Sequence, residues 1–253
     1  MCHAHPDAVQ QHLGDSVKFD GSYITVQRSL RDLCDLYLQQ QPWGDLGIDL
    51  CLGLPMDKQA APYEYMFLPD YIESGFNHAQ VRQDGDWQPL VKETIVTYQP
   101  KPQAAAKSLL TPFVLFTILL LFGLWLTYRG YRRGKGYFVF DIIIFSIIGL
   151  VGWLLVFLWF FTDHAAAAGN FNLLWAVPLH FPLATVLFRR KKPAWLAWYY
   201  RLVVVVLALT LVGWPIWPQD LNMALLPLLL LLLVRTIFIQ QWITRQYRGE
   251  FSA

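Results

Sequence analysis

The stretch 138-FVFDIIIFSIIGLVGWLLVFLWFF-161 decides the fold, because it is almost continuously apolar and its one charged residue is Asp141. A helix needs about 20 such residues to cross a bilayer. Four other stretches after the first hundred residues meet this requirement, although the third is short and contains Pro178 and Pro182, which a span tolerates where neighbouring helices cover the freed carbonyls. The five predicted spans are approximately Leu109–Tyr128, Phe138–Phe161, Asn172–Phe188, Trp195–Trp214 and Leu221–Gln240.

Charge is distributed unevenly along the 253 residues. Residues 1–107 hold 8 Lys/Arg and 14 Asp/Glu, whereas residues 108–253 hold 12 Lys/Arg and 4 Asp/Glu. This asymmetry, with 55% hydrophobic residues, excludes a single soluble globule, a disordered chain and a collagen-like chain. The basic residues lie beside long apolar runs, as in membrane proteins, so nucleic acid is not an expected partner.

The loops between the predicted spans indicate an orientation. Residues 129–135 and 189–192 each carry four cationic residues, whereas residues 162–171 and 215–220 carry no Lys or Arg. Positively charged loops stay in the cytoplasm. The pattern therefore predicts a multi-pass membrane protein, with residues 1–107 on the outer side and residues 246–253 a cytoplasmic tail.

Residues 1–107 are predicted to be mostly helical with a short β end. Apolar residues at helical spacing predict a helix over Ser29–Gln39. Asp84-Gly85 between two β-type runs predicts a hairpin, and Pro100–Ala106 is a Pro/Ala linker into the membrane. Residues 1–30 show no export signal, so we expect this chain to be the C-terminal part of a longer protein.

Several motifs resemble a known family. The stretch 42-PWGDLGIDLCLG-53, followed by 64-EYMFLP-69, resembles the end of the periplasmic domain in the Lnb-like family of Bacteroidota. The runs 149-GLVG-152, 157-FLWFFTDH-164 and 172-NLLWAVPLH-180 resemble the five-helix membrane domain of that family. The implied fold is a membrane α-helical one: a five-helix transmembrane bundle over residues 108–245, preceded by the C-terminal part of an NlpC/P60-like α+β domain.

The resemblance implies a lipoprotein N-acyltransferase of a bacterial inner membrane, with residues 1–107 in the periplasm. Such an enzyme moves an acyl chain from a membrane phospholipid to the N-terminal cysteine amine of diacylated lipoproteins, and no cofactor is implied. By position, Cys2 matches the family's catalytic cysteine, but Met1, His5 and Asp7 replace the family's asparagine and two arginines. The partner histidine belongs to a motif that this chain does not contain, so we expect the chain alone to be inactive. In the alternative interpretation, Cys2 has no catalytic role and is part of a frayed terminus.

Other polar residues have two interpretations each. His3, His5 and His12 lack a completing carboxylate motif, so no metal site is predicted. Asp163 and His164 form either an acid–base pair or a simple helix end. His180 is either a functional residue or a neutral imidazole, bonded to a neighbouring helix or to a carbonyl released by proline. We hypothesise that a kink at Pro178 turns His180 towards Asp163 and His164. Together with Asn172 and Trp175, these residues would line a lipid-binding notch for the headgroup of the acyl donor.

The remaining intramembrane polar residues have structural explanations. Arg235 is expected to extend to the cytoplasmic headgroups, and Asp141 to pair with Arg132, Arg133 or Lys135. Gly149 and Gly152 predict close helix packing. Cys34 and Cys51 are expected to be buried apolar residues rather than a bridge.

Two functions of different classes remain open. In the first, the chain is the membrane portion of the acyltransferase. In the second, it is a non-catalytic inner-membrane module that binds lipid or a partner protein.

Overall fold

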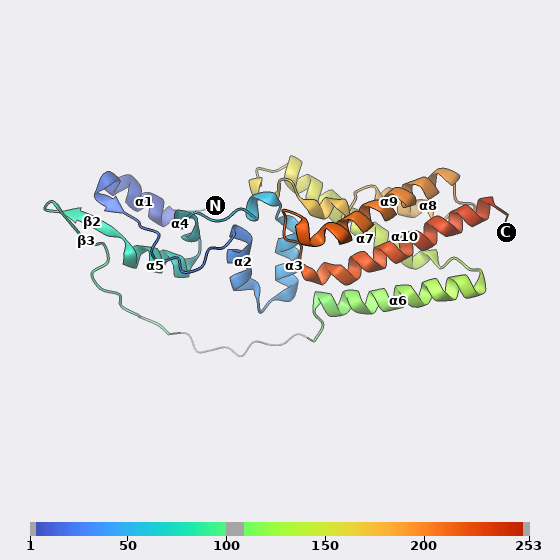
Figure 1. Ribbon diagram of the computed structural model, residues 1–253, viewed down its shortest axis with the longest axis horizontal. Coiled ribbons are helices and arrows are strands. Elements are labelled where there is room, and N and C mark those ends of the chain that lie inside the picture. Colours follow the sequence, from blue (N-terminus) through green and yellow to red (C-terminus); the bar gives the residue numbers. More distant parts are fainter. Residues whose placement is uncertain (1–3, 100–108, 250–253) are drawn as a thin grey trace. The chain divides into compact units, whose positions relative to one another are not determined.

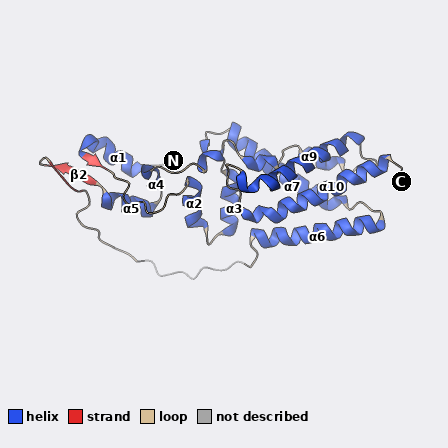
Figure 2. Ribbon diagram, viewed as in Figure 1, coloured by secondary structure: helices blue, strands red, loops and turns tan. Residues whose placement is uncertain are grey.

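The computed structural model describes residues 4–99 and 109–249. They form two compact units, Met1–Gln40 with Met56–Lys107, and Gln41–Pro55 with Ser108–Ala253. Helices make up most of the second unit, and the described strands all belong to the first (Figure 2).

The first unit is a small α+β assembly. Its helices are α1 (Ala4–Leu13), α2 (Leu30–Leu38), α4 (Pro62–Tyr65) and α5 (Pro69–His78), and its strands are β1 (Val17–Lys18), β2 (Gln80–Gln83) and β3 (Asp86–Pro89). The strands form an antiparallel sheet in the order β1-β2-β3, with Val17 opposite Val81 and Gln83 opposite Asp86. The predicted hairpin is confirmed, since Asp84 and Gly85 have the positive φ angles, 52° and 96°, that tight hairpin turns require.

The predicted helix after Ser29 is also confirmed. The Ser29 side chain accepts a hydrogen bond from the Asp32 amide, and the Asp32 carboxylate accepts one from the Ser29 amide, which is a complete capping box. Leu33, Tyr65 and Met66 are fully buried in this unit.

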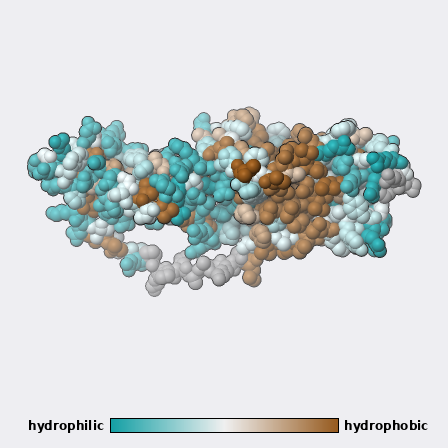
Figure 3. Space-filling model, viewed as in Figure 1, coloured by the Kyte–Doolittle hydropathy of each residue, from teal (hydrophilic) through white to brown (hydrophobic). Residues whose placement is uncertain are grey.

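The second unit, the helical unit, contains four helices long and apolar enough to cross a membrane. They are α6 (Pro112–Arg133), α7 (Phe138–Phe160), α9 (Ala194–Gly213) and α10 (Leu226–Tyr247). Figure 1 shows them side by side, and α10 packs against both α6 and α9. A 22-residue helix is about 33 Å long, which matches a bilayer's hydrocarbon core of about 30 Å. A broad apolar surface covers these helices (Figure 3).

The third predicted span differs from the prediction of a continuous helix. Residues 171–174 form a 3₁₀ turn, and α8 (His180–Val186) has only 7 residues. Pro178 lacks the amide proton that a helix interior needs, so α8 begins only after it. Pro182 lies within the first turn of α8, where the missing donor is tolerated.

Residues 171–192, which we call the broken segment, nevertheless follow the length of α10. At its start, the Phe171 amide donates to the Gln219 side chain, in the loop that precedes α10. Beyond its end, the Lys192 carbonyl accepts a hydrogen bond from Tyr247, the last residue of α10. Residues 171–192 therefore pass from one end of the helical unit to the other.

The predicted close packing at Gly149 and Gly152 is confirmed. A Cβ at Gly149 would lie 2.2 Å from the Phe181 nitrogen, and one at Gly152 would lie 2.0 Å from the Ala176 oxygen. Helix α7 thus approaches the backbone of the broken segment directly, which any larger side chain would prevent.

The predictions for Arg235 and Asp141 are wrong. Arg235 is 1% exposed and Asp141 is 0% exposed, and two parallel hydrogen bonds of 2.6 and 2.7 Å join them. A third bond of 2.7 Å joins Arg235 to the Thr127 hydroxyl. Because the partners come from α7, α10 and α6, the arginine is held inside the bundle rather than extended to the headgroups.

Candidate functional site

The proposed catalytic residue Cys2 lies outside the described residues. Cys51, which belongs to the helical unit, is a half-buried thiol at the end of α3 (Pro42–Cys51), and burial raises its pKa. A thiol with a raised pKa forms little of the reactive thiolate. Cys51 is therefore not prepared to act as a nucleophile.

The helix α3 belongs to the helical unit, although the predicted boundary at residue 107 would group it with the preceding domain. Helix ends leave backbone carbonyls without partners. Here side-chain amides from two loops supply the donors: Asn170 reaches the Leu50 carbonyl at 2.7 Å and Gln219 reaches the Leu52 carbonyl at 3.0 Å. We call Asn170, Asn172, Gln219 and Asn222 the amide clamp.

Backbone contact reinforces the amide clamp. The Gly53 amide donates to the Ala166 carbonyl at 2.8 Å. A Cβ at Gly53 would lie 2.0 Å from the Ala168 carbonyl oxygen, so only glycine fits this approach. The end of α3 is therefore held tightly against the loop that follows α7.

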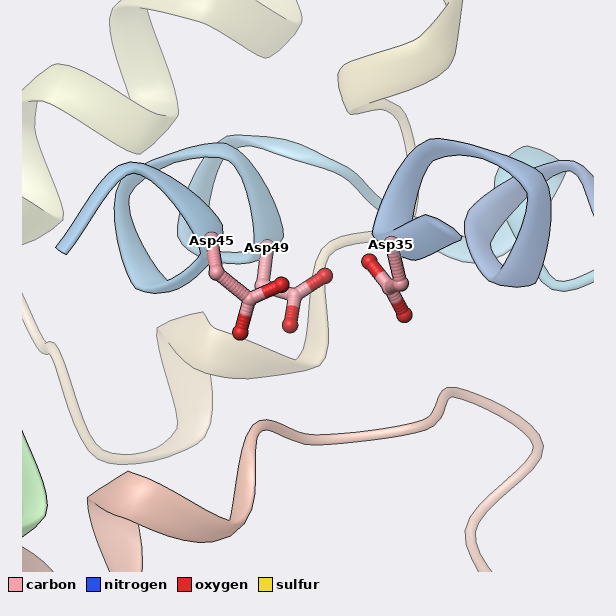
Figure 4. A group of neighbouring side chains, drawn as sticks. All are labelled: Asp35, Asp45 and Asp49. Atoms are coloured by element: carbon pink, nitrogen blue, oxygen red, sulfur yellow. The ribbon is translucent and has the colours of Figure 1, made fainter. Parts of the chain in front are cut away.

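Two carboxylates, Asp45 and Asp49, lie four residues apart on one face of α3 (Figure 4). The amide nitrogen of Asn222 donates to Asp45 at 2.9 Å and to Asp49 at 2.8 Å. Burial raises the pKa of Asp45, the Asn222 hydrogen bond opposes this shift, and the nearby Asp49 charge adds to it. Asp35, also drawn in Figure 4, belongs to the other unit.

The orientation of Asn222 argues against a metal at these carboxylates. Its side-chain oxygen accepts a hydrogen bond from the Ala224 amide at 3.0 Å, so its nitrogen faces the two aspartates. An NH₂ group is a donor and cannot ligate a cation. The arrangement is suited to holding two acidic groups together on α3.

His180 is 1% exposed and lies in a chain of hydrogen bonds inside the bundle. Asn172 accepts from the Trp175 indole at 3.0 Å, and His180 Nε2 lies 3.2 Å from the Trp175 carbonyl. A carbonyl only accepts, so Nε2 carries the proton, and Nδ1 accepts from the Tyr199 hydroxyl at 2.7 Å. These are the contacts of a neutral imidazole, bonded to α9 and to the Trp175 carbonyl, which lies three residues before Pro178.

The notch hypothesis groups His180 with Asp163 and His164, and the described structure gives their surroundings separately. Asp163 and His164 are exposed in the turn after α7, where their backbone carbonyls cap the short turn over Ala165–Ala167. Among the described residues, His180 contacts Trp175, Tyr199 and Phe145 instead of this pair. The helix break turns His180 inward, because a buried imidazole needs two hydrogen-bond partners and the bundle provides both.

Sequence reasoning missed the amide clamp, the Asp45–Asp49 pair and Tyr199. One available signal was the position of the amides: Asn170 and Gln219 lie in the two loops that lack Lys and Arg, and Asn172 and Asn222 follow those loops within two residues. Neutral amides satisfy carbonyls and carboxylates equally well, so the sequence alone did not identify their partners.

Residues 104–247 match the family model of the Lnb transmembrane domain, which is more than half of the chain. The chain belongs to the Lnb transmembrane-domain family. The expected resemblance is confirmed for this part, and the multi-pass membrane character with it. No curated protein and no solved structure matches the chain. The match with the Lnb transmembrane domain ends at Tyr247, where α10 ends, and starts after α3, so α3 lies outside the matched region.

Proposed function

We propose that this chain is the membrane portion of an Lnb-like lipoprotein N-acyltransferase. Such an enzyme transfers an acyl chain from a phospholipid to the N-terminal cysteine amine of a diacylated lipoprotein. The observation that carries the proposal is the match of residues 104–247 with the Lnb transmembrane domain. In the proposed orientation, residues 1–107 are periplasmic and the C-terminus is cytoplasmic, as the cationic loops 129–135 and 189–192 indicate.

In this proposal the chain crosses the inner membrane five times. Four crossings are α6, α7, α9 and α10, and residues 171–192 make the fifth as a broken segment. Irregular backbone is tolerated at membrane depth where protein covers it. The close contact with α7 at Gly149 and Gly152 supplies this cover.

The proposed role of the helical unit is to hold the two lipid substrates at the periplasmic surface. The exposed apolar side chains of α7, among them Trp153, Phe157 and Phe160, offer a surface for acyl chains. Burial of a chain gives about 0.8 kcal/mol per CH₂, so binding needs no polar motif. Asp163 and His164, exposed beside this surface, stay the proposed contacts for a headgroup, while Asn172, Trp175 and His180 shape the segment behind them.

The test is photocrosslinking in nanodiscs that contain the full chain. A diacylated lipopeptide and a phosphatidylethanolamine, each with a photoreactive group near the headgroup, are the probes. We expect crosslinks to residues 161–170 and few to residues 189–192. Equal crosslinking at both loops would contradict the proposed substrate surface.

Two further measurements test the remaining parts of the proposal. Reporter fusions after Lys135 and after Asn170 should report opposite sides of the membrane, and a common side would disprove the five crossings. In the intact acyltransferase, lipoproteins should gain the mass of one acyl chain. Lipid binding without this mass gain would favour the non-catalytic module.

A further inference from the structure

A cationic hollow lies on α6 near its Arg133 end, far along the helix from α3. Its volume is about 420 Å³, and its lining residues are Trp125, Tyr128, Arg129, Arg132 and Arg133. These residues recur at intervals of three and four, so they share one face of the helix. No residue of this group takes part in the site described above.

The three arginines of the hollow lack anionic partners in the described part of the chain. Residues 109–140 contain no Asp or Glu, and the next acidic residue, Asp141, is held by Arg235. Lys135 adds a further positive charge close by. The hollow therefore has a concentrated positive charge that the acidic side chains of the described residues do not balance.

Arg129 is the most informative of the three. Its guanidinium carbon lies 5.1 Å from the centre of the Trp125 ring, which orients the side chain along the helix. Its Nε is buried and has no hydrogen-bond partner among the described residues. A buried donor without a partner is uncommon in folded proteins, so this group points to an acceptor that is bound from outside.

The hollow lies on α6 between an apolar stretch and a cationic end of the helix. Trp125 and Arg133 are about 12 Å apart along the helix at 1.5 Å per residue. On the Trp125 side, α6 exposes Leu121, Phe122 and Leu124, which are suited to hydrocarbon. Towards the ends of the helices the surface of the helical unit changes from apolar to hydrophilic (Figure 3).

We propose that this hollow binds the phosphate of an anionic glycerophospholipid, such as phosphatidylglycerol or cardiolipin. The forked donors of Arg129 and Arg132 match the oxygens of a phosphodiester, and Arg133 adds a third positive charge that suits the second phosphate of cardiolipin. Trp125 and Tyr128 line the same hollow and are suited to pack against the glycerol and the first methylene groups, as aromatic residues do at membrane interfaces. The lipid comes from the leaflet that surrounds the Arg133 end of α6, and it is distinct from the acyl donor proposed above.

The test compares two variants with the same change in charge. Arg129→Gln with Arg132→Gln removes two cations from the hollow. Arg189→Gln with Arg190→Gln removes two exposed cations from the loop between α8 and α9. Native mass spectrometry of the full chain in detergent measures binding of phosphatidylglycerol and of phosphatidylcholine. We expect the first variant to bind phosphatidylglycerol at least about tenfold more weakly than the parent chain does. The second variant should bind it with the affinity of the parent chain.

A third variant separates charge from geometry. Arg129→Lys with Arg132→Lys keeps both charges but loses the forked donors, so its affinity should lie between the parent chain and the glutamine variant. Circular dichroism confirms that each variant is folded. Equal losses in both glutamine variants, or equal binding of the two lipids by the parent chain, would overturn the proposal. Displacement of the lipid by millimolar inorganic phosphate would assign the hollow to free phosphate instead.

Discussion

The helical unit joins distant segments in two contrasting ways. At one end, the neutral amide clamp attaches α3 to the bundle, mostly by hydrogen bonds to backbone carbonyls. In the interior, the charged pair Arg235–Asp141 joins α10 to α7. Amides accept many partners at low cost, whereas a buried charge requires one specific counter-charge. The clamp should therefore tolerate single changes that the ion pair cannot.

The largest effect is expected at the ion pair. Arg235→Met leaves the Asp141 carboxylate buried without its partner, which costs about 3–5 kcal/mol of unfolding free energy. Adding Asp141→Leu removes the stranded charge and should restore much of that loss. Denaturant unfolding in mixed micelles measures both values. A double variant as unstable as Arg235→Met alone would show that the pair does not carry the effect.

A smaller effect is expected at the clamp. Asn222→Ala removes the one amide that both Asp45 and Asp49 share, leaving two part-buried carboxylates without this donor, at a cost of about 1–3 kcal/mol. Hydrogen exchange should then rise in α3 while α7 and α10 stay protected. A uniform rise throughout the helical unit would contradict local attachment.

The pH dependence of α3 follows from the raised pKa of Asp45. A carboxyl whose pKa is raised on folding stabilises the fold below its unfolded value of 3.8, and this contribution is lost as the pH rises through the folded pKa. Exchange protection of α3 should therefore fall as the pH rises above about 4. Asp45→Asn should flatten this dependence. An unchanged profile in that variant would assign the titration to another group.

A moderate effect on stability is expected within the hydrogen-bond chain that contains His180. Tyr199→Phe removes the donor to His180 Nδ1, which costs about 1–2 kcal/mol because a buried acceptor loses its partner. His180→Leu should insert into the membrane normally, since leucine is favourable there. If the intact enzyme keeps full activity with His180→Leu, the residue serves stability alone.

The smallest effect on stability is expected at the exposed pair. Asp163→Ala and His164→Ala should each change the unfolding free energy by less than about 0.5 kcal/mol, as surface substitutions do. Lipid crosslinking to residues 161–170 should nevertheless fall in the double variant. Unchanged crosslinking would remove the pair from the proposed headgroup contacts.

Local patterns in the sequence were sufficient for the elements that depend on nearby residues. Hydropathy predicted α6, α7, α9 and α10, because helix formation in a bilayer depends mainly on about 20 consecutive apolar residues. The capping box of Ser29 and the turn at Asp84-Gly85 also depend on nearby residues, because each of these interactions closes within four residues.

Partnerships between distant residues required the three-dimensional structure. Asp141 was equally able to pair with nearby cations, and its choice of Arg235 depends on how α7 and α10 pack. The inward turn of His180 depends on Tyr199, and the attachment of α3 depends on loops more than 100 residues away. Composition and spacing predict which groups need partners, but the packing of helices determines which partner lies within hydrogen-bond distance, because that distance allows an error of less than an ångström.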